Sequence, residues 1–105
     1  GVHWRDLKVW RKTHALVLEI YRVTGDSPGA KHMGWLTNST ELPNLAANIV
    51  EGQSRSTTKE YLQFLYNARG SIEELRYFLL LSRDLKFLST DAHAALETEC
   101  ESANK

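Results

Sequence analysis

Cysteine is almost absent from this sequence, because Cys100 is the only one in 105 residues. A single cysteine can form neither an intrachain disulfide nor a cysteine-rich metal site. No apolar run approaches the roughly 20 residues that are needed to cross a bilayer. The residues from Gly1 to Arg5 also lack the charged and then apolar layout of a signal peptide. From these absences we expect a cytoplasmic protein with no membrane partner.

The chain also has no net charge, since 13 basic and 13 acidic residues give a formal charge of zero. A neutral total argues against a strongly basic nucleic-acid binder. The charge is nevertheless uneven, because basic residues outnumber acidic ones over positions 1–35 and the reverse holds over positions 89–105. With 42% hydrophobic and 25% charged residues, the composition is that of an ordinary folded domain, and the length allows one domain over residues 1–105.

Apolar residues recur with helical spacing, and no β-type alternation, repeat or low-complexity tract interrupts them. The first predicted helix runs from about Asp6, as N-cap, to Thr24, and the second from about Trp35 to Glu51, with Gly52 as a C′ glycine. The third begins with a capping box at 57–60 and continues for about 25 residues. The fourth begins at Ser89 or Thr90, as N-cap, and continues to the end. Pro43 should kink or break the second of them. The predicted fold is all-α, an antiparallel four-helix bundle.

The third helix carries the clearest pattern, a seam whose members are spaced alternately by four and three residues. These members are Tyr61, Leu65, Ala68, Ile72, Leu75, Leu79 and Ser82. Such a seam is typical of helices that pack nearly parallel. Gly70 lies inside this helix at a cost of about 1 kcal/mol relative to alanine. We therefore expect another backbone or a bulky side chain to approach it closely.

The first helix has an apolar arc of about 200° at 100° per residue, wider than a surface helix needs. One stripe within the arc contains Leu7, Trp10, His14, Val17, Leu18 and Tyr21. A second stripe beside it contains Val9, Leu16 and Ile20. The surplus predicts burial against another subunit or against the fourth helix. Val9, Leu16 and Ile20 are therefore candidate residues of an oligomer interface.

The remaining face of the first helix is basic and carries Lys8, Arg11, Lys12 and Arg22. Such a face can contact phosphates, which makes it a candidate surface for a nucleic acid or another partner. Glu19 interrupts it, and a solvated bundle surface is the commoner explanation of such a pattern.

Two polar segments are unusual for a plain bundle. They supply the candidate residues Asn48, Glu51, Arg55, Arg69, Ser71 and Glu74. We expect these to form a structural polar network that fixes the register of the second and third helices. No nucleophile–base–orienter set accompanies them, so no catalytic site is predicted. No Glu-x-x-His pair occurs either, and neither a metal site nor a cofactor is expected.

The same segments carry a family resemblance. Residues 48–52 read Asn-Ile-Val-Glu-Gly and are followed by Arg55, residues 64–75 read Phe-Leu-Tyr-Asn-Ala-Arg-Gly-Ser-Ile-Glu-Glu-Leu, and residues 6–10 read Asp-Leu-Lys-Val-Trp. Over nearly the whole chain, this pattern resembles the bacterial four-helix bundle proteins encoded by 23S rRNA intervening sequences. The resemblance implies an up-down bundle that forms a homo-oligomeric ring of five subunits, with no assigned enzymatic activity. It also implies a distant relation to the accessory protein of diversity-generating retroelements, which engages a reverse transcriptase and nucleic acid.

One departure from the family pattern concerns function. Where the family often has a glutamine and paired arginines, residues 37–41 read Thr-Asn-Ser-Thr-Glu, which weakens any nucleic-acid surface on the second helix. Two functions remain open: a non-enzymatic homo-oligomer that binds RNA or a nucleoprotein, and an oligomeric scaffold that binds only protein. No motif favours an enzyme.

Overall fold

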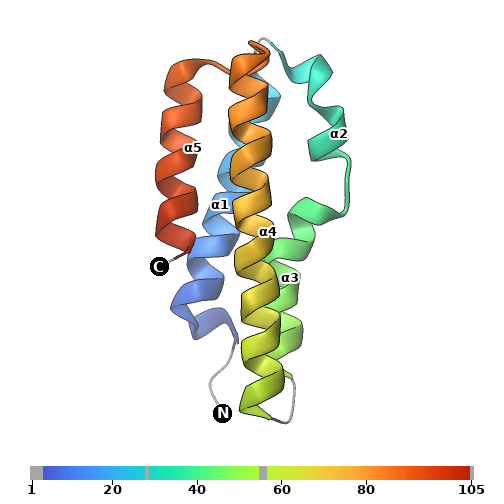
Figure 1. Cartoon of the computed structure of the whole chain (residues 1–105), viewed down its shortest axis with the longest axis vertical. Helices are drawn as coiled ribbons and strands as arrows, with labels where there is room; N and C mark the ends of the chain where they lie inside the picture. The colour runs from blue at the N-terminus through green and yellow to red at the C-terminus, as the bar shows by residue number, and fades with distance from the viewer. Residues whose placement is uncertain (1–3, 28, 55–56, 105) are drawn as a thin grey trace.

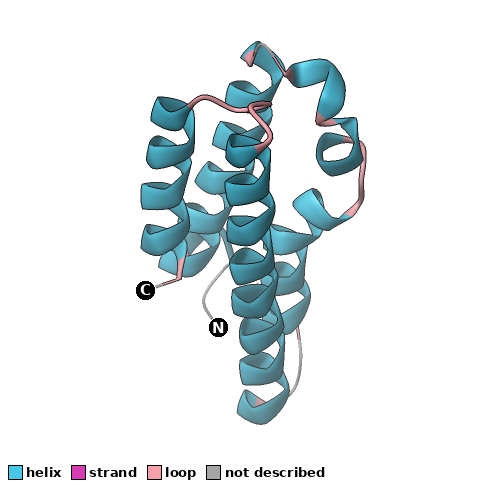
Figure 2. Cartoon of the chain, turned by 45° about the horizontal axis from the view of Figure 1, so that its top comes forward, coloured by secondary structure: helices cyan, strands magenta, loops and turns pink. Residues whose placement is uncertain are grey.

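The structure is a computed structural model that describes residues 4–27, 29–54 and 57–104. Its elements are two 3-10 turns and five α-helices, in the order η1 (Trp4–Asp6), α1 (Lys8–Asp26), η2 (Ala30–His32), α2 (Gly34–Thr37), α3 (Glu41–Gln53), α4 (Thr58–Asp84) and α5 (Thr90–Ala103). Within these described ranges no strand occurs, and loops and turns join the helices (Figure 2). The predicted all-α four-helix bundle is confirmed, with α2 and α3 sharing the second position.

The four positions of the bundle are antiparallel to their neighbours (Figure 1). Both α1 and α4 pack against α3 and α5, so α1 and α4 lie diagonally across the bundle. The molecule is elongated, with extents of 44 × 22 × 18 Å. All five α-helices contribute to the hydrophobic core, in which Leu16, Ile20, Leu79 and Leu96 have no exposed area.

α1 begins and ends differently from the prediction. Asp6 belongs to the preceding 3-10 turn and is not the N-cap, which is Leu7, without a side-chain hydrogen bond. At the other end the helix continues through Gly25 to Asp26, and Ser27 is extended with φ −71° and ψ 145°. A residue that precedes proline is driven out of the helical region, and Pro28 follows Ser27 in the sequence. The helix therefore ends because of this proline rather than at Gly25.

The second position of the bundle is broken, as predicted, just before Pro43. α2 ends at Thr37, and α3 begins at Glu41 after three non-helical residues, 38–40. Pro43 is the third residue of α3, where a backbone N–H would have no partner within the helix in any case. The proline is therefore accommodated by the start of a new helix.

Gly52 lies inside α3, which extends to Gln53, so the prediction that Gly52 is a C′ glycine was wrong. The reason for glycine here is the close approach of α4. A Cβ atom built at this position would lie 2.8 Å from Cβ of Phe64 and 3.3 Å from Cδ1 of Tyr61. Gly52 therefore allows α3 and α4 to come close together near the end of the bundle where they are joined.

α4 follows the sequence pattern closely. Thr57 is its N-cap, and the Thr57 hydroxyl accepts a hydrogen bond of 3.1 Å from the backbone N–H of Glu60. The seam members that are buried are Ala68, Ile72, Leu75, Leu79 and Ser82. Within the described chain nothing approaches Gly70 closely, because this residue is exposed and no atom lies within 4 Å of a Cβ built there.

α5 begins at the predicted cap and returns along α1 and α4. The Ser89 hydroxyl accepts a hydrogen bond of 3.1 Å from the backbone N–H of Ala92. At the same end of the bundle, the Ser27 hydroxyl donates to the backbone carbonyl of Phe87. This contact joins the end of α1 to the turn between α4 and α5.

Candidate functional site

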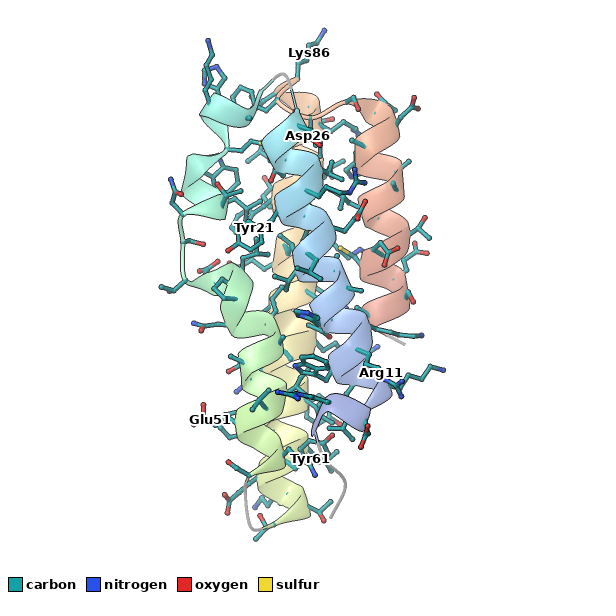
Figure 3. The ribbon with its side chains drawn as sticks, turned by 180° about the vertical axis from the view of Figure 1, so that it is seen from behind. Arg11, Tyr21, Asp26, Glu51, Tyr61 and Lys86 are labelled. Carbon is teal, nitrogen blue, oxygen red and sulfur yellow. The ribbon has the colours of Figure 1, made fainter. Side chains whose placement is uncertain are left out.

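The basic face predicted for α1 is present over its first two turns. Lys8 and Arg11 are exposed, Lys12 is partly exposed, and none of the three forms an ion pair among the residues that the structure describes. Arg11 donates one hydrogen bond of 3.1 Å to the backbone carbonyl of Asp6 and points away from the bundle (Figure 3). Three cations therefore lie together at one end of α1.

Arg22 does not belong to this cluster. It lies near the other end of α1, where its Nε atom donates a hydrogen bond of 3.2 Å to Glu19 and its Nη2 atom forms an ion pair with the same carboxylate. The hydrogen bond from Arg22 lowers the pKa of Glu19 below its usual value. With this charge already paired within the helix, the candidate phosphate-binding surface consists of Lys8, Arg11 and Lys12, which we call the basic cluster.

The polar residues expected to form one network are distributed over different surfaces. Asn48, Ser71 and Glu74 line a cavity of about 190 Å³ between α3 and α4, together with leucines of the core. Arg69 lines a separate groove of about 330 Å³. Glu51 is exposed, and the Ser71 hydroxyl donates 3.0 Å to the backbone carbonyl of Asn67 in its own helix.

Arg69 therefore lies apart from the cavity that Asn48, Ser71 and Glu74 line, and the structural network expected of the six residues stays a prediction. Arg55, the sixth residue of the predicted set, lies outside the described residues.

An ion-pair network that the sequence did not predict joins α4 to α5. Arg76 donates from Nε to Glu97 at 3.0 Å and from Nη1 to Glu73 at 3.0 Å, and its side chain is 29% exposed. Asn104 donates to the Glu73 carboxylate at 2.7 Å. The hydrogen bonds from Asn104 and then from Arg76 lower the pKa of Glu73. These contacts fix the position of α5 against α4.

Cys100 lies in the core beside this network and has no exposed area. Burial, and to a lesser degree the negative charge of Glu97, raises the pKa of Cys100 to about 12. The thiolate is the reactive form of cysteine, so this residue acts here as a small packing residue.

The buried face of α1 does not coincide with either of the two apolar stripes. The buried residues of the helix are Thr13, Leu16, Val17, Ile20 and Thr24. Leu16 and Ile20 are fully buried within the chain, so their assignment to an oligomer interface was wrong. Val9 remains partly exposed.

Three members of the other stripe of α1 are on the surface. His14 is exposed and stacks on Trp10 at 4.8 Å, Leu18 is 56% exposed and Tyr21 is 39% exposed. The buried face of α1 follows Leu16, Val17 and Ile20. Thr13 and Thr24 complete its helical spacing.

A second apolar surface follows the outward face of α4. Leu62, Tyr66 and Tyr77 are large side chains with exposed fractions of 46%, 67% and 58%. Gly70 lies between the two tyrosines, four residues after the first and seven before the second, which places all three on one face of the helix. We call Tyr66, Gly70 and Tyr77 the α4 stripe.

Neither a metal site nor a membrane span emerges from the described part of the chain. No group of three or more histidine, cysteine, aspartate or glutamate side chains is placed there to hold a metal ion. Over the same residues, the helices are too short or too polar to cross a bilayer.

The antiparallel helices, the basic cluster and the exposed apolar faces define a small all-α bundle protein whose candidate sites are surfaces. The family model of the 23S rRNA-intervening sequence protein matches residues 5–105, and the chain belongs to this family. No curated protein matches the chain.

Proposed function

We propose that the chain is a non-enzymatic, self-associating helical bundle that binds RNA, alone or within a nucleoprotein, through the basic cluster of α1. The observation that carries this proposal is the placement of Lys8, Arg11 and Lys12 on one end of an exposed helix face, with no carboxylate paired to them among the described residues. Phosphate contacts from lysine and arginine provide affinity that does not depend on sequence. Membership of the 23S rRNA-intervening sequence protein family makes RNA the first nucleic acid to test.

Self-association strengthens this proposal, because three cations on one chain form a weak site. An oligomer repeats the cluster in every subunit, and several weak contacts to one RNA then raise the overall affinity by avidity. The α4 stripe supports self-association. Two exposed tyrosines flank a glycine that no contact within the described chain explains, and a helix face with a small residue at its centre allows a second helix to come close.

Charge reversal tests the RNA proposal. We expect the triple variant Lys8→Glu, Arg11→Glu and Lys12→Glu to lose RNA binding, because the change replaces attraction to phosphates by repulsion. For wild type, the logarithm of the association constant should fall with the logarithm of salt concentration with a slope of about −2, as roughly three contacts to single-stranded RNA require. Mobility shift at several salt concentrations measures both.

The matched control reverses three cations elsewhere, Lys31, Lys59 and Lys86, all of which are exposed. It has the same net charge as the test variant and should retain the binding of RNA. If the two triple variants bind RNA equally, or if wild type does not bind at all, the RNA part of the proposal is abandoned.

Sedimentation tests the oligomer. We expect wild type to sediment as several copies, five on the family resemblance, and Tyr77→Asp to shift the distribution towards single chains, because a carboxylate replaces an aromatic ring in the proposed contact. Leu85→Asp is the control, since Leu85 is 53% exposed but follows α4 outside the stripe. A wild type that stays a single copy at every concentration would contradict the proposal.

The second candidate function is an oligomeric scaffold that binds only protein. It is favoured by the zero net charge of the chain and by the large apolar side chains on α1 and α4. Retained oligomerisation together with absent RNA binding would select it.

A further inference from the structure

A pair of stacked rings lies beside the basic cluster, on the first two turns of α1. The ring centroids of Trp10 and His14 are 4.8 Å apart, and the ring planes are 10° from parallel. Trp10 is partly buried and His14 is exposed, so the imidazole forms the outer end of the stack. Neither residue belongs to the hydrophobic core of the bundle. The stack is therefore a surface feature of α1.

Helix geometry places this stack at the edge of the basic cluster. At about 100° per residue, Arg11 lies about 60° from His14 on one side and about 60° from Lys8 on the other. Lys12 follows about 40° beyond Lys8. Residues 8–14 span about 9 Å along the axis, since each residue rises by about 1.5 Å. The rings and the cations therefore form one continuous strip, in which Arg11 separates the stack from the lysines.

His14 can make a further contact. Its imidazole forms no hydrogen bond or ion pair with the residues that the structure describes, and no second ring stacks on it there. Leu18 follows four residues later on the same side of the helix and is 56% exposed, which provides an apolar contact beside the imidazole. A planar group can therefore stack on the face of His14 that turns away from Trp10.

Aromatic rings beside cations are the combination with which proteins bind single-stranded nucleic acid. A nucleobase stacks on an aromatic ring, while lysine and arginine contact the phosphates of the same strand. In a duplex the bases are already stacked on one another and are not available to a side chain. A protein partner fits this strip less well, because it would have to supply carboxylates for three cations that form no ion pair within the described chain.

We propose that this strip of α1 binds unpaired bases of RNA. The basic cluster holds the phosphates, and one base stacks on His14 and so extends the stack that begins at Trp10. This inference rests on the proposed function, because it assigns a substrate class, single-stranded RNA, to the same site. Phosphate contacts alone carry no such preference for bases. The aromatic stack is the part of the site that selects an unpaired strand.

The first test compares a single-stranded RNA with a hairpin of the same length and composition, by mobility shift with the full chain. Phosphate contacts alone would favour the hairpin, because a duplex has the higher charge density. We expect wild type to bind the single strand about tenfold more tightly, since stacking of one base contributes roughly that factor or more. A 2-aminopurine base within the single strand should also lose fluorescence on binding, because its emission falls when it stacks.

Substitution of His14 separates stacking from charge. His14→Ala should lose both the preference for the single strand and the change in 2-aminopurine fluorescence. His14→Phe keeps an aromatic ring at the same position and should retain both. The slope of affinity against salt concentration should be the same for these variants and wild type, because the phosphate contacts are unchanged.

His32→Ala is the matched control. His32 is also exposed and also stacks on an aromatic ring, that of Phe87, at 4.8 Å. It lies in η2, beyond the other end of α1 and far from the basic cluster (Figure 1). Its replacement should leave the preference for single-stranded RNA unchanged.

Three results would overturn this inference. The first is equal affinity of wild type for the single strand and the hairpin, and the second is the same behaviour of His14→Ala and His32→Ala. The third is a change in sedimentation caused by His14→Ala, because the stack would then belong to a contact between protein chains. In all three cases charge reversal of the basic cluster can still abolish RNA binding, so the proposed function can stand when this inference fails. A wild type that binds no RNA contradicts both.

Discussion

Replacement of Gly52 by alanine is expected to lower the free energy of unfolding by about 1–3 kcal/mol, the usual cost of forcing extra volume into a well-packed site. The new methyl group would lie 2.8 Å from Cβ of Phe64, an atom fixed to the backbone of α4, so the two helices would have to separate. Urea unfolding at a fixed protein concentration measures the change. A variant as stable as wild type would show that α3 and α4 are not in such close contact.

Gly70→Ala is the matched control for this experiment, because it is the same substitution at the glycine of the other sequence motif. No atom lies near the position that its Cβ would take, and the residue is exposed inside a helix. Both glycine variants are compared in the Tyr77→Asp background, where the proposed contact between subunits is removed. Alanine at position 70 of the single chain should raise the free energy of unfolding by up to about 1 kcal/mol. Opposite signs for the two glycines are expected, and equal signs would contradict the packing described for them.

Replacement of Arg76 by methionine is the second change with a large expected effect. Methionine keeps the apolar contacts of the side chain but removes the hydrogen bonds to Glu97 and Glu73. This leaves the partly exposed carboxylate of Glu97 and the exposed carboxylate of Glu73 without their cation. Hydrogen bonds to charged groups contribute about 1.5–3 kcal/mol, so a loss of about 2 kcal/mol is expected at neutral pH. Thermal unfolding should show a Tm lower by roughly 10 °C.

The pH dependence separates this network from simple packing. The pKa of Glu73 is lowered in the folded chain, so its contribution to stability is present at neutral pH and is lost as the pH falls through that lowered pKa. The difference between wild type and Arg76→Met should therefore shrink in acid. Arg83→Met is the control, since Arg83 pairs with its exposed sequence neighbour Asp84 at 3.0 Å, and its loss should change stability little. A gap between wild type and Arg76→Met that is constant down to acid pH would assign the loss to packing.

The helices were predictable because their signals are local. Thr57 and Ser89 are capping residues that can be read from the few positions after them, and the seam of α4 is a spacing within one segment. The break before Pro43 follows from the covalent geometry of proline. Each of these features requires no knowledge of what packs against the helix.

The orientation of α1 was not predictable in the same way. An apolar arc of about 200° leaves several directions that bury almost equal hydrophobic area, and the choice is made by what α3 and α5 offer. Thr13 and Thr24 extend the spacing of Leu16, Val17 and Ile20, and all five are buried. Threonine is often exposed, so its position in the spacing carried little weight in the sequence.

The sequence could not say which of the six polar residues lie together, because two motifs that are close in pattern need not be close in space. Arg69 and Glu74 are five residues apart on α4, which turns them towards different neighbours. Arg76 on α4 bonds to Glu97 on α5, which lies 21 residues later in the sequence. The two residues meet because packing sets the register of this helix pair. The charge pattern alone contained no sign of this partner.

The buried thiol gives the chain a built-in reporter of its own motions. Because Cys100 is sealed between α5 and its neighbours and keeps its proton at ordinary pH, a thiol reagent can reach it only when α5 lifts from the rest of the bundle. The rate at which Cys100 is modified therefore measures how often α5 opens, without any engineered label.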